Sequence, residues 1–402
     1  MAEVQGAIPR IRPGHGPAVL GYGFRPFFFA AALWGVLSML LWLPAAAGIP
    51  VLATAFDPLA WHAHEMLFGF VGAAVCGFLL TAIPNWTGRL PLQGAPLGGL
   101  VLLWLAGRIA VALSAEIGAG LAAAIDLSLW LVLLGVVLRE ILTGKNWRNL
   151  PMVGALGLFL VANALMHADV LGWVETGAAG WRLGMAVIVM LIVLIGGRIV
   201  PSFTRNWLAK RGPGPLPAPF DRIDRLTMAG SLVAVLSWAV LPDASITGIL
   251  LALAAVLNAV RLGRWQGHRT AAEPLVLVLH LGYVWIPIGL ALLAASILTT
   301  AVPALAAIHA FGAGAFATMM LAIMTRATLG HTGRTLHAGT ATTVIYALVT
   351  LAALLRLGAT LAPGAYTPLL HSSGGAWIAA FALYLAIYGP MLLSPRPDGK
   401  PG

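Results

Sequence analysis

Long apolar stretches dominate this chain and constrain its fold more than any other feature. A bilayer core about 30 Å thick takes roughly 20 apolar residues per helical span, because no backbone polar group can stay unpaired in lipid. The sequence therefore predicts an all-α, polytopic integral membrane protein with about twelve transmembrane helices. The apolar stretches cover residues 27–44, 59–83, 95–114, 118–138, 150–170, 181–200, 226–242, 246–262, 274–298, 302–326, 339–358 and 375–393.

Composition excludes several other classes of protein. Of the 402 residues, 60% are hydrophobic and 9% are charged, whereas an ordinary soluble domain has about 25% charged residues. The single cysteine, Cys76, excludes a disulfide framework and any iron–sulfur or zinc site built from clustered thiolates. The formal charge is +10, but the basic residues are spread thinly between apolar stretches. We therefore expect a lipid bilayer, and not nucleic acid, as a partner.

The basic residues lie mainly on one side of the predicted topology. With the N-terminus in the cytoplasm, 20 of the 23 Lys and Arg residues fall on or near the cytoplasmic face, as the positive-inside rule requires. We expect a multi-pass protein of the bacterial inner membrane with both termini in the cytoplasm. Five acidic and two basic residues fall on the opposite face: Asp57, Glu116, Asp169, Glu175, Asp243, Arg182 and Arg356.

The chain reads as one transmembrane domain, residues 26–393, between cytoplasmic tails at 1–25 and 394–402. A cytoplasmic linker at 201–225 contains the Pro/Gly-rich run 212–217, which cannot continue a helix. A second pattern suggests three four-helix repeats, because helices 2, 6 and 10 share direction and similar ends. A shift of 245 residues aligns His64 with His309, Gly69 with Gly314, Ala82 with Ala327, and Thr87-Gly88-Arg89 with Thr332-Gly333-Arg334.

Histidines form a layer in the outer half of the predicted membrane. His62, His64, His167 and His309 lie within about two turns of their helix ends, and His280 enters from the inner side. An ionisable group inside the bilayer is costly and persists mainly where it pairs or binds a ligand. Neutral imidazole ligates haem iron and copper, so these five histidines are candidate metal ligands. The alternative is that each is a hydrogen-bonding anchor near a helix end.

The start of the second helix limits which histidine can be a ligand. At about 100° per residue, His62 and His64 point in nearly opposite directions, so only one can face a given neighbouring helix. His62 shares its face with Glu65. This carboxylate could orient a ligand histidine as a second-shell acceptor, carry protons, or only favour the first helical turn through the helix dipole.

Arginines supply further candidates. Arg198 and Arg326 lie near the cytoplasmic ends of helices 6 and 10, where they could pair with haem propionates or another anion, or simply extend to the inner interface. Arg108 in helix 3 and Asp126 in helix 4 could pair with each other in a structural role.

Five segments together resemble the signature stretches of the NnrS family, and the resemblance runs from about residue 20 to the C-terminus. It implies a haem- and copper-containing, twelve-helix membrane protein that is associated with bacterial denitrification and the response to nitric oxide. It implies no defined reaction. The segments are 23–28 (GFRPFF), 61–70 (WHAHEMLFGF), 78–89 (FLLTAIPNWTGR), 196–206 (GGRIVPSFTRN) and 324–334 (MTRATLGHTGR).

The leading hypothesis is therefore a protein that binds haem b and copper and that binds or removes nitric oxide, or relieves nitrosative stress. The repeat alignment favours haem between helices 2 and 10, held by His309 with His64 or His62. This arrangement is similar to that of the haem–copper oxidase superfamily, but helices 6 and 7 lack its histidine cluster. Copper would need His167 or His280. Whether the protein is a nitric oxide-related oxidoreductase is left open.

Two hypotheses from other classes stay open. A secondary transporter of a metal or small anion could use the intramembrane histidines and Glu65 to bind substrate or relay protons, and two six-helix halves are compatible with it. An assembly or scaffold protein without catalysis would use the same helices for contacts only.

Overall fold

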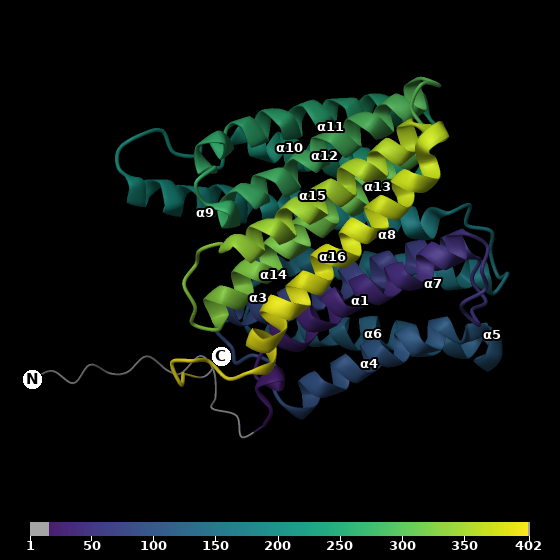
Figure 1. Ribbon diagram of the computed structural model, residues 1–402, viewed down its shortest axis with the longest axis horizontal. Coiled ribbons are helices and arrows are strands. Elements are labelled where there is room, and N and C mark those ends of the chain that lie inside the picture. The colour runs from purple at the N-terminus through teal and green to yellow at the C-terminus, as the bar shows by residue number, and fades with distance from the viewer. Residues whose placement is uncertain (1–15, 401–402) are drawn as a thin grey trace, which may run out of the picture.

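The structure is a computed structural model that describes residues 16–400, and these residues form helices without any strand (Figure 1). Twelve helical spans are long and apolar enough to cross a membrane, so the predicted fold class is confirmed. The short helix η1 (Ala18–Leu20) precedes the first span, and α5 (Ser114–Ile117) and η6 (Gly267–Thr270) lie between spans. The spans are α1 (Phe24–Ala46); α2 (Pro58–His64), η2 (Glu65–Val71) and α3 (Gly72–Thr87); α4 (Ala95–Ala112); α6 (Ala119–Thr143); η3 (Trp147–Asn149) and α7 (Leu150–Val170); α8 (Ala179–Leu191), η4 (Ile192–Gly196), α9 (Gly197–Leu208) and η5 (Ala209–Arg211); α10 (Arg222–Val240); α11 (Ser245–Gly263); α12 (Pro274–Leu298); α13 (Ala304–His309), η7 (Ala310–Phe316) and α14 (Ala317–His331); α15 (Thr340–Leu361); and η8 (Pro363–Ala365) with α16 (Tyr366–Leu393).

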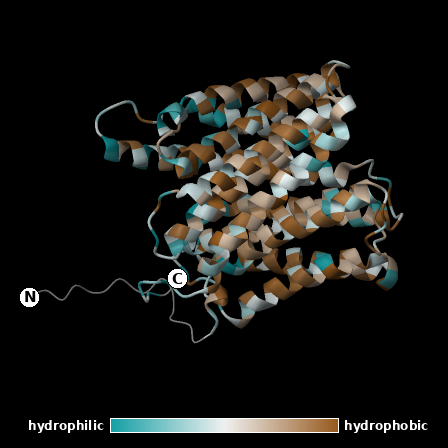
Figure 2. Cartoon of the chain, viewed as in Figure 1, coloured by the Kyte–Doolittle hydropathy of each residue, from teal (hydrophilic) through white to brown (hydrophobic). Residues whose placement is uncertain are grey.

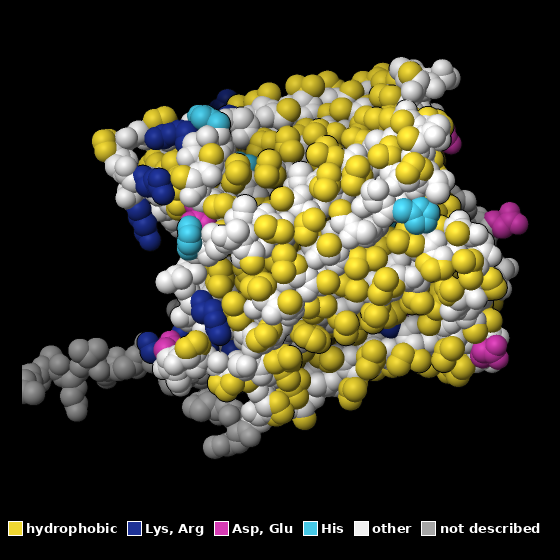
Figure 3. All heavy atoms as spheres, viewed as in Figure 1, with side chains coloured by type: hydrophobic (Ala, Val, Ile, Leu, Met, Phe, Trp, Pro, Cys, Tyr) yellow, Lys and Arg dark blue, Asp and Glu magenta, His cyan; other side chains and the backbone are white. Residues whose placement is uncertain are grey.

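The spans lie side by side, and both ends of the described chain are at one end of the bundle (Figure 1). We call this end, which carries Gly16 and Lys400, the terminal face. Hydrophobic residues cover the length of the helices, and polar residues gather toward their ends (Figure 2). Most visible Lys and Arg side chains lie at the terminal face (Figure 3). This distribution matches the charge asymmetry that the sequence predicts.

The predicted linker at 201–225 begins later than expected. The helix α9 continues through Pro201 to Leu208, and α9 projects at the terminal face (Figure 1). One proline removes a single backbone donor, which does not end a helix whose other bonds are intact. The non-helical connection covers 212–221, and Asp221 caps α10 by accepting from the N–H of Ile223. Residues 1–15 of the predicted N-terminal tail lie outside the described residues.

Three spans contain a π-helical segment, in which the helix widens locally. These segments, η2, η4 and η7, occur in the second, sixth and tenth spans, four spans apart. The same spans are among the four most buried of the described chain. The spacing agrees with three four-helix repeats.

The 245-residue alignment also pairs positions with the same local structure. Gly88 and Gly333 follow α3 and α14 with φ values of +70° and +73°, a conformation that glycine adopts without strain. Aligned Gly69 and Gly314 each lie against a tryptophan ring, from α1 and α12 respectively. The helices α1 and α12 are the first and ninth spans, so each begins one of the three four-helix sets, which are spans 1–4, 5–8 and 9–12.

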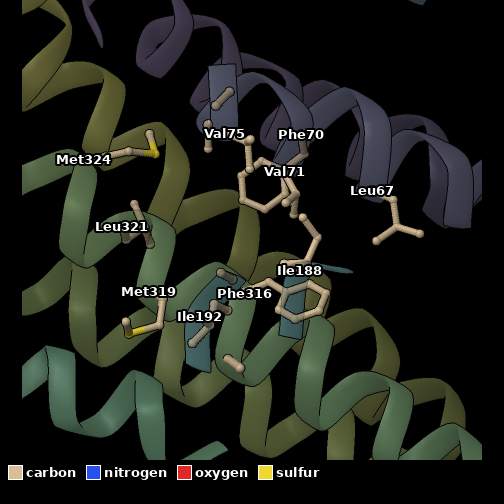
Figure 4. Close-up of a cluster of buried hydrophobic side chains, with 14 of the residues drawn as sticks. Leu67, Phe70, Val71, Val75, Ile188, Ile192, Phe316, Met319, Leu321 and Met324 are labelled. Atoms are coloured by element: carbon tan, nitrogen blue, oxygen red, sulfur yellow. The ribbon is translucent and has the colours of Figure 1, made fainter. Parts of the chain in front are cut away.

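Apolar side chains from the π-containing spans meet at the centre of the bundle (Figure 4). Phe70 and Val71 of η2 approach Ile188 of α8 and Phe316 of η7 there, and all four are at most 2% exposed. The first and last spans also pack together. Arg25 secures this closure by donating to the carbonyls of Leu392 and Ser394 at 2.9 and 2.7 Å. The fold is thus a closed arrangement of helices around three central spans.

Candidate functional site

A large cavity lies among the spans toward the face opposite the termini. Its volume is about 820 Å³, and its walls come from α1, α2, η2, α7, α8, α13, η7, α15 and α16. Most of its lining is apolar or aromatic, including Trp42, Trp181 and Trp377. Ligand pockets in proteins have volumes of about 300–1,000 Å³, apolar walls and a few placed polar groups. The cavity therefore has the size and character of a site for an organic cofactor.

His62 reaches this cavity from α2. The Asp57 carboxylate caps α2 by accepting from the N–H groups of Leu59 and Ala60, both at 3.0 Å. The imidazole of His62 stacks on Trp42, with ring centres 4.2 Å apart and planes 16° apart. Its Nδ1 is buried without a hydrogen-bond partner. The stacking fixes the plane of one imidazole at the cavity wall.

His309 faces the same cavity as the last residue of α13. Its Nδ1 lies 2.9 Å from the carbonyl oxygen of Leu305, one turn earlier. A carbonyl only accepts, so Nδ1 carries the proton and donates it. In the neutral ring, Nε2 is then left with its lone pair, which is the state of a metal-ligating histidine.

Arg356 of α15 is the one basic residue among the described residues that line the cavity. It is 9% exposed, and its guanidinium lies 5.6 Å from the centre of the Tyr366 ring. Its Nη1 has no hydrogen-bond partner. The positive charge acts on both His62 and His309. Two imidazoles and a guanidinium therefore converge on one cavity.

A second polar group lies on the other side of α2. It is closed and almost fully buried, since each member is at most 2% exposed. We call it the buried ion cluster, and it joins the second, third, fourth and fifth spans. Its members are His64, Glu65, Arg108, Asp126, Asn163 and His167.

The charges of the buried ion cluster balance. His64 Nδ1 donates to Glu65 Oε1 at 3.0 Å, and Nε2 donates to Asn163 Oδ1 at 2.8 Å, so the ring carries both protons. Arg108 donates to Glu65 Oε1 at 2.5 Å and also to Asp126, which confirms the predicted Arg108–Asp126 pair. Two cations thus face two carboxylates, as buried charges require.

Part of this cluster could hold a metal ion. Ligand atoms of His64, Asp126 and His167 all lie within 4.8 Å of one another, and this is the one such group in the described part of the chain. Two imidazoles and a carboxylate suit copper or zinc. Asp126 Oδ2 already accepts from Asn163 at 2.7 Å and from His167 at 3.1 Å. A metal would therefore replace existing hydrogen bonds.

The structure divides the predicted histidine layer between the two sites. His62 and His64 point to different neighbours, as their spacing predicts, and His62 and His309 share the cavity. His64 does not reach His309, because both of its ring nitrogens are bonded within the buried ion cluster. The repeat alignment paired His64 with His309, but it is His62 that shares the cavity with His309.

Glu65 does not serve His62 as the helical period predicted. Its Oε1 accepts from His64 and from Arg108. The prediction assumed a regular α-helix, whereas the π-helical segment η2 begins at Glu65 and changes the angular spacing of side chains.

Three other predicted residues lie away from both sites. Arg326 stacks over the Phe203 ring at 4.0 Å, and it is 17 residues from His309, roughly 25 Å along the same span. Arg198 is exposed on α9. His280 contacts Thr204 Oγ1 at 2.8 Å through Nε2 and does not line the cavity. Neither of these arginines lines the cavity.

Sequence reasoning missed Arg356 and Asn163 as site residues. Arg356 carried a signal, because it is one of two basic residues on the acidic face and falls within an apolar span. Asn163 carried none, since an uncharged amide near a helix end is common. Its place between His64 and Asp126 depends on how α7 packs against α2 and α6.

These features define a class: a polytopic all-α membrane protein with a cofactor-sized, imidazole-bearing cavity beside a buried ion cluster. The family model described as NnrS protein matches residues 18–396. The chain belongs to the NnrS family. No curated protein matches it. At the level of the family, this membership supports a membrane protein of the nitric oxide response.

Proposed function

We propose that this protein binds haem b in the 820 Å³ cavity, where His62 and His309 would hold it, and acts in nitric oxide metabolism or the nitrosative-stress response. One observation carries the proposal: two imidazoles from the second and tenth spans face a single cofactor-sized cavity. Histidines on neighbouring transmembrane helices are common haem ligands. Membership of the family gives no support to a transporter.

The residues present fit such a group. The Leu305 carbonyl holds His309 with Nε2 available, and Trp42 holds the ring of His62. Gly312 lines the cavity, and no atom lies within 4 Å of where its Cβ would be, so the wall stays open to a flat ligand. When bound, a haem held by both imidazoles would supply electron transfer.

Orientation in the membrane is a further part of the proposal. We place the protein in the bacterial inner membrane with the terminal face in the cytoplasm. Lys and Arg gather at that face (Figure 3), as the positive-inside rule requires. The cavity would then lie toward the periplasm. A cysteine introduced at Trp173, which is 75% exposed on the opposite face, should react with a membrane-impermeant maleimide in intact spheroplasts.

Copper is the second metal that we propose, at His64, Asp126 and His167. This is the best donor set among the described residues. Metal analysis of purified protein should find copper in the wild type and less in His167→Ala. Equal copper in the two proteins would remove the site.

Haem binding is tested by spectroscopy of detergent-purified protein from haem-supplied cells. The wild type should show a Soret band, and both His62→Ala and His309→Ala should lose most of the bound haem, because each removes one of the two imidazoles that would hold it. The matched control is His371→Ala. His371 donates to a carbonyl four residues earlier at 2.8 Å, as His309 does, but it is exposed and does not line the cavity.

Two results would contradict the haem assignment. The first is a wild type without a Soret band. The second is full haem content in His309→Ala, which would leave the cavity without its proposed ligand.

A further inference from the structure

Arg356 is an unusual cation because it is buried at membrane depth without a counter-ion. It is 9% exposed, and Nη1 has no hydrogen-bond partner. Two carboxylates line the same cavity, but both are used elsewhere. Asp57 caps α2, and Asp169 accepts from the N–H of Thr176 at 2.6 Å and from its hydroxyl.

Arg108 occupies the corresponding span of the first four-helix repeat, and it has the carboxylate partners that Arg356 lacks. Arg108 lies on the third span of the first set, and Arg356 lies on the third span of the last set. Arg108 is compensated by Glu65 and Asp126. The residue aligned with Glu65 in the last set is Ala310, which has no charge. A charged group inside a membrane persists where it pairs or binds something.

We propose that Arg356 binds an anionic oxygen group of the ligand in the cavity, either a carboxylate or a small oxyanion. The planar guanidinium presents paired N–H donors that match both groups. The cavity is large enough to bring such a group to Nη1, and the charge acts on both candidate haem ligands. The inference rests on the proposed function and deepens it, because it names the anion-binding residue of the same cavity.

This chemistry has two sources, which different probes separate. The anion could be a haem propionate or a free oxyanion such as nitrite. Protohaem and its dimethyl ester share the iron and the macrocycle, but the ester has methyl ester groups in place of the two charged carboxylates. Their affinities for haem-free wild type therefore report on the first source. Nitrite added to haem-free protein, against chloride at equal ionic strength, reports on the second source through the thermal unfolding midpoint.

If the propionate is the anion, the wild type should bind protohaem on the order of 10- to 100-fold more tightly than the dimethyl ester. Arg356→Gln should bind both haems equally, at the level of the ester, and Arg356→Lys should recover part of the difference. The matched control is Arg182→Gln. Arg182 is half-buried at the same face and does not line the cavity, so its variant should behave as the wild type.

If a free oxyanion is the ligand, protohaem and the ester should bind equally, and nitrite should raise the unfolding midpoint of the wild type but not of Arg356→Gln. The inference is overturned if the wild type binds both haems equally and nitrite has no effect. This result uses no variant, so a misfolded Arg356→Gln cannot obscure it. Absence of any haem binding would instead refute the proposed function, while the nitrite measurement would still test Arg356.

Discussion

The buried ion cluster and the cavity lie on two sides of α2 and differ in how they treat an intramembrane arginine. In the cluster, Arg108 meets Glu65 and Asp126, so the protein itself supplies the counter-charges. In the cavity, Arg356 lies near the Tyr366 ring, and its Nη1 has no hydrogen-bond partner. In the first arrangement the charge of the arginine is balanced from within the protein. In the second, the two carboxylates that line the cavity are bonded to other groups, and this difference is the basis for proposing that a ligand pairs with Arg356.

The largest difference between the two sites is expected when a counter-charge is removed from the buried ion cluster. Asp126→Ala should lower the free energy of unfolding by about 3–5 kcal/mol, because Arg108 and His64 would stay buried without their shared carboxylate. Titration with SDS in mixed micelles would measure the change. In haem-free protein, Arg356→Ala should change the free energy of unfolding by less than about 1 kcal/mol, because the contact that it removes is with the neutral side chain of Tyr366 and not with a carboxylate.

Equal losses of stability in Asp126→Ala and Arg356→Ala would contradict the distinction between the two sites. They would mean that the cavity, too, compensates its arginine from within the protein.

Substituting one glycine from each region should have a smaller effect on stability. Gly69 lies on the packed side of η2, and Gly312 lines the cavity. In Gly69→Ala the new Cβ would clash with Trp34 Nε1 and lie 2.8 Å from Glu65 Oε2, so the packed side of η2 must shift at a cost of about 1–3 kcal/mol. In Gly312→Ala the Cβ would meet no atom within 4 Å. Its stability should be unchanged or raised by up to about 1 kcal/mol.

The same SDS titration measures the stability of both glycine variants. For Gly312→Ala, which narrows the cavity, the Soret band of the purified protein gives a second measurement. A destabilised Gly312→Ala would show that the cavity wall is packed in the protein and is not open to a ligand.

The sequence was sufficient for the twelve spans because lipid imposes a length and an apolar composition on each of them. It was also sufficient for the Arg108–Asp126 pair, since two opposite charges in consecutive apolar helices have few other partners. The charge asymmetry and the 245-residue repeat are likewise properties of residue order alone.

The division of the histidines was not predictable in the same way. It depends on the π-helical segment η2, which displaces Glu65 from the face of His62 and which no hydrophobic period reveals. The cavity depends on volume left between nine helical segments, and volume is a property of packing and not of any one stretch. Arg356 therefore looked like a surface residue until its neighbours were known.

The smallest effect concerns an ion pair outside the membrane-spanning segments, which gives a baseline for the two buried arginines. Arg264 Nη1 donates to Asp221 Oδ1 at 3.0 Å, and this bond lowers the pKa of Asp221 from 3.8 to about 2. A carboxyl with a lowered pKa stabilises the fold fully above its unfolded pKa near 4 and loses that contribution as the pH falls through about 2. In Arg264→Gln the pKa should return toward 3.8, so the variant should have a slightly lower thermal unfolding midpoint than the wild type above pH 5, and the difference should vanish near pH 2. A difference that persists at pH 2 would show that Arg264 acts through packing and not through charge. The pair is exposed to water, so its loss should be far smaller than that in Asp126→Ala, where the same kind of bond is buried.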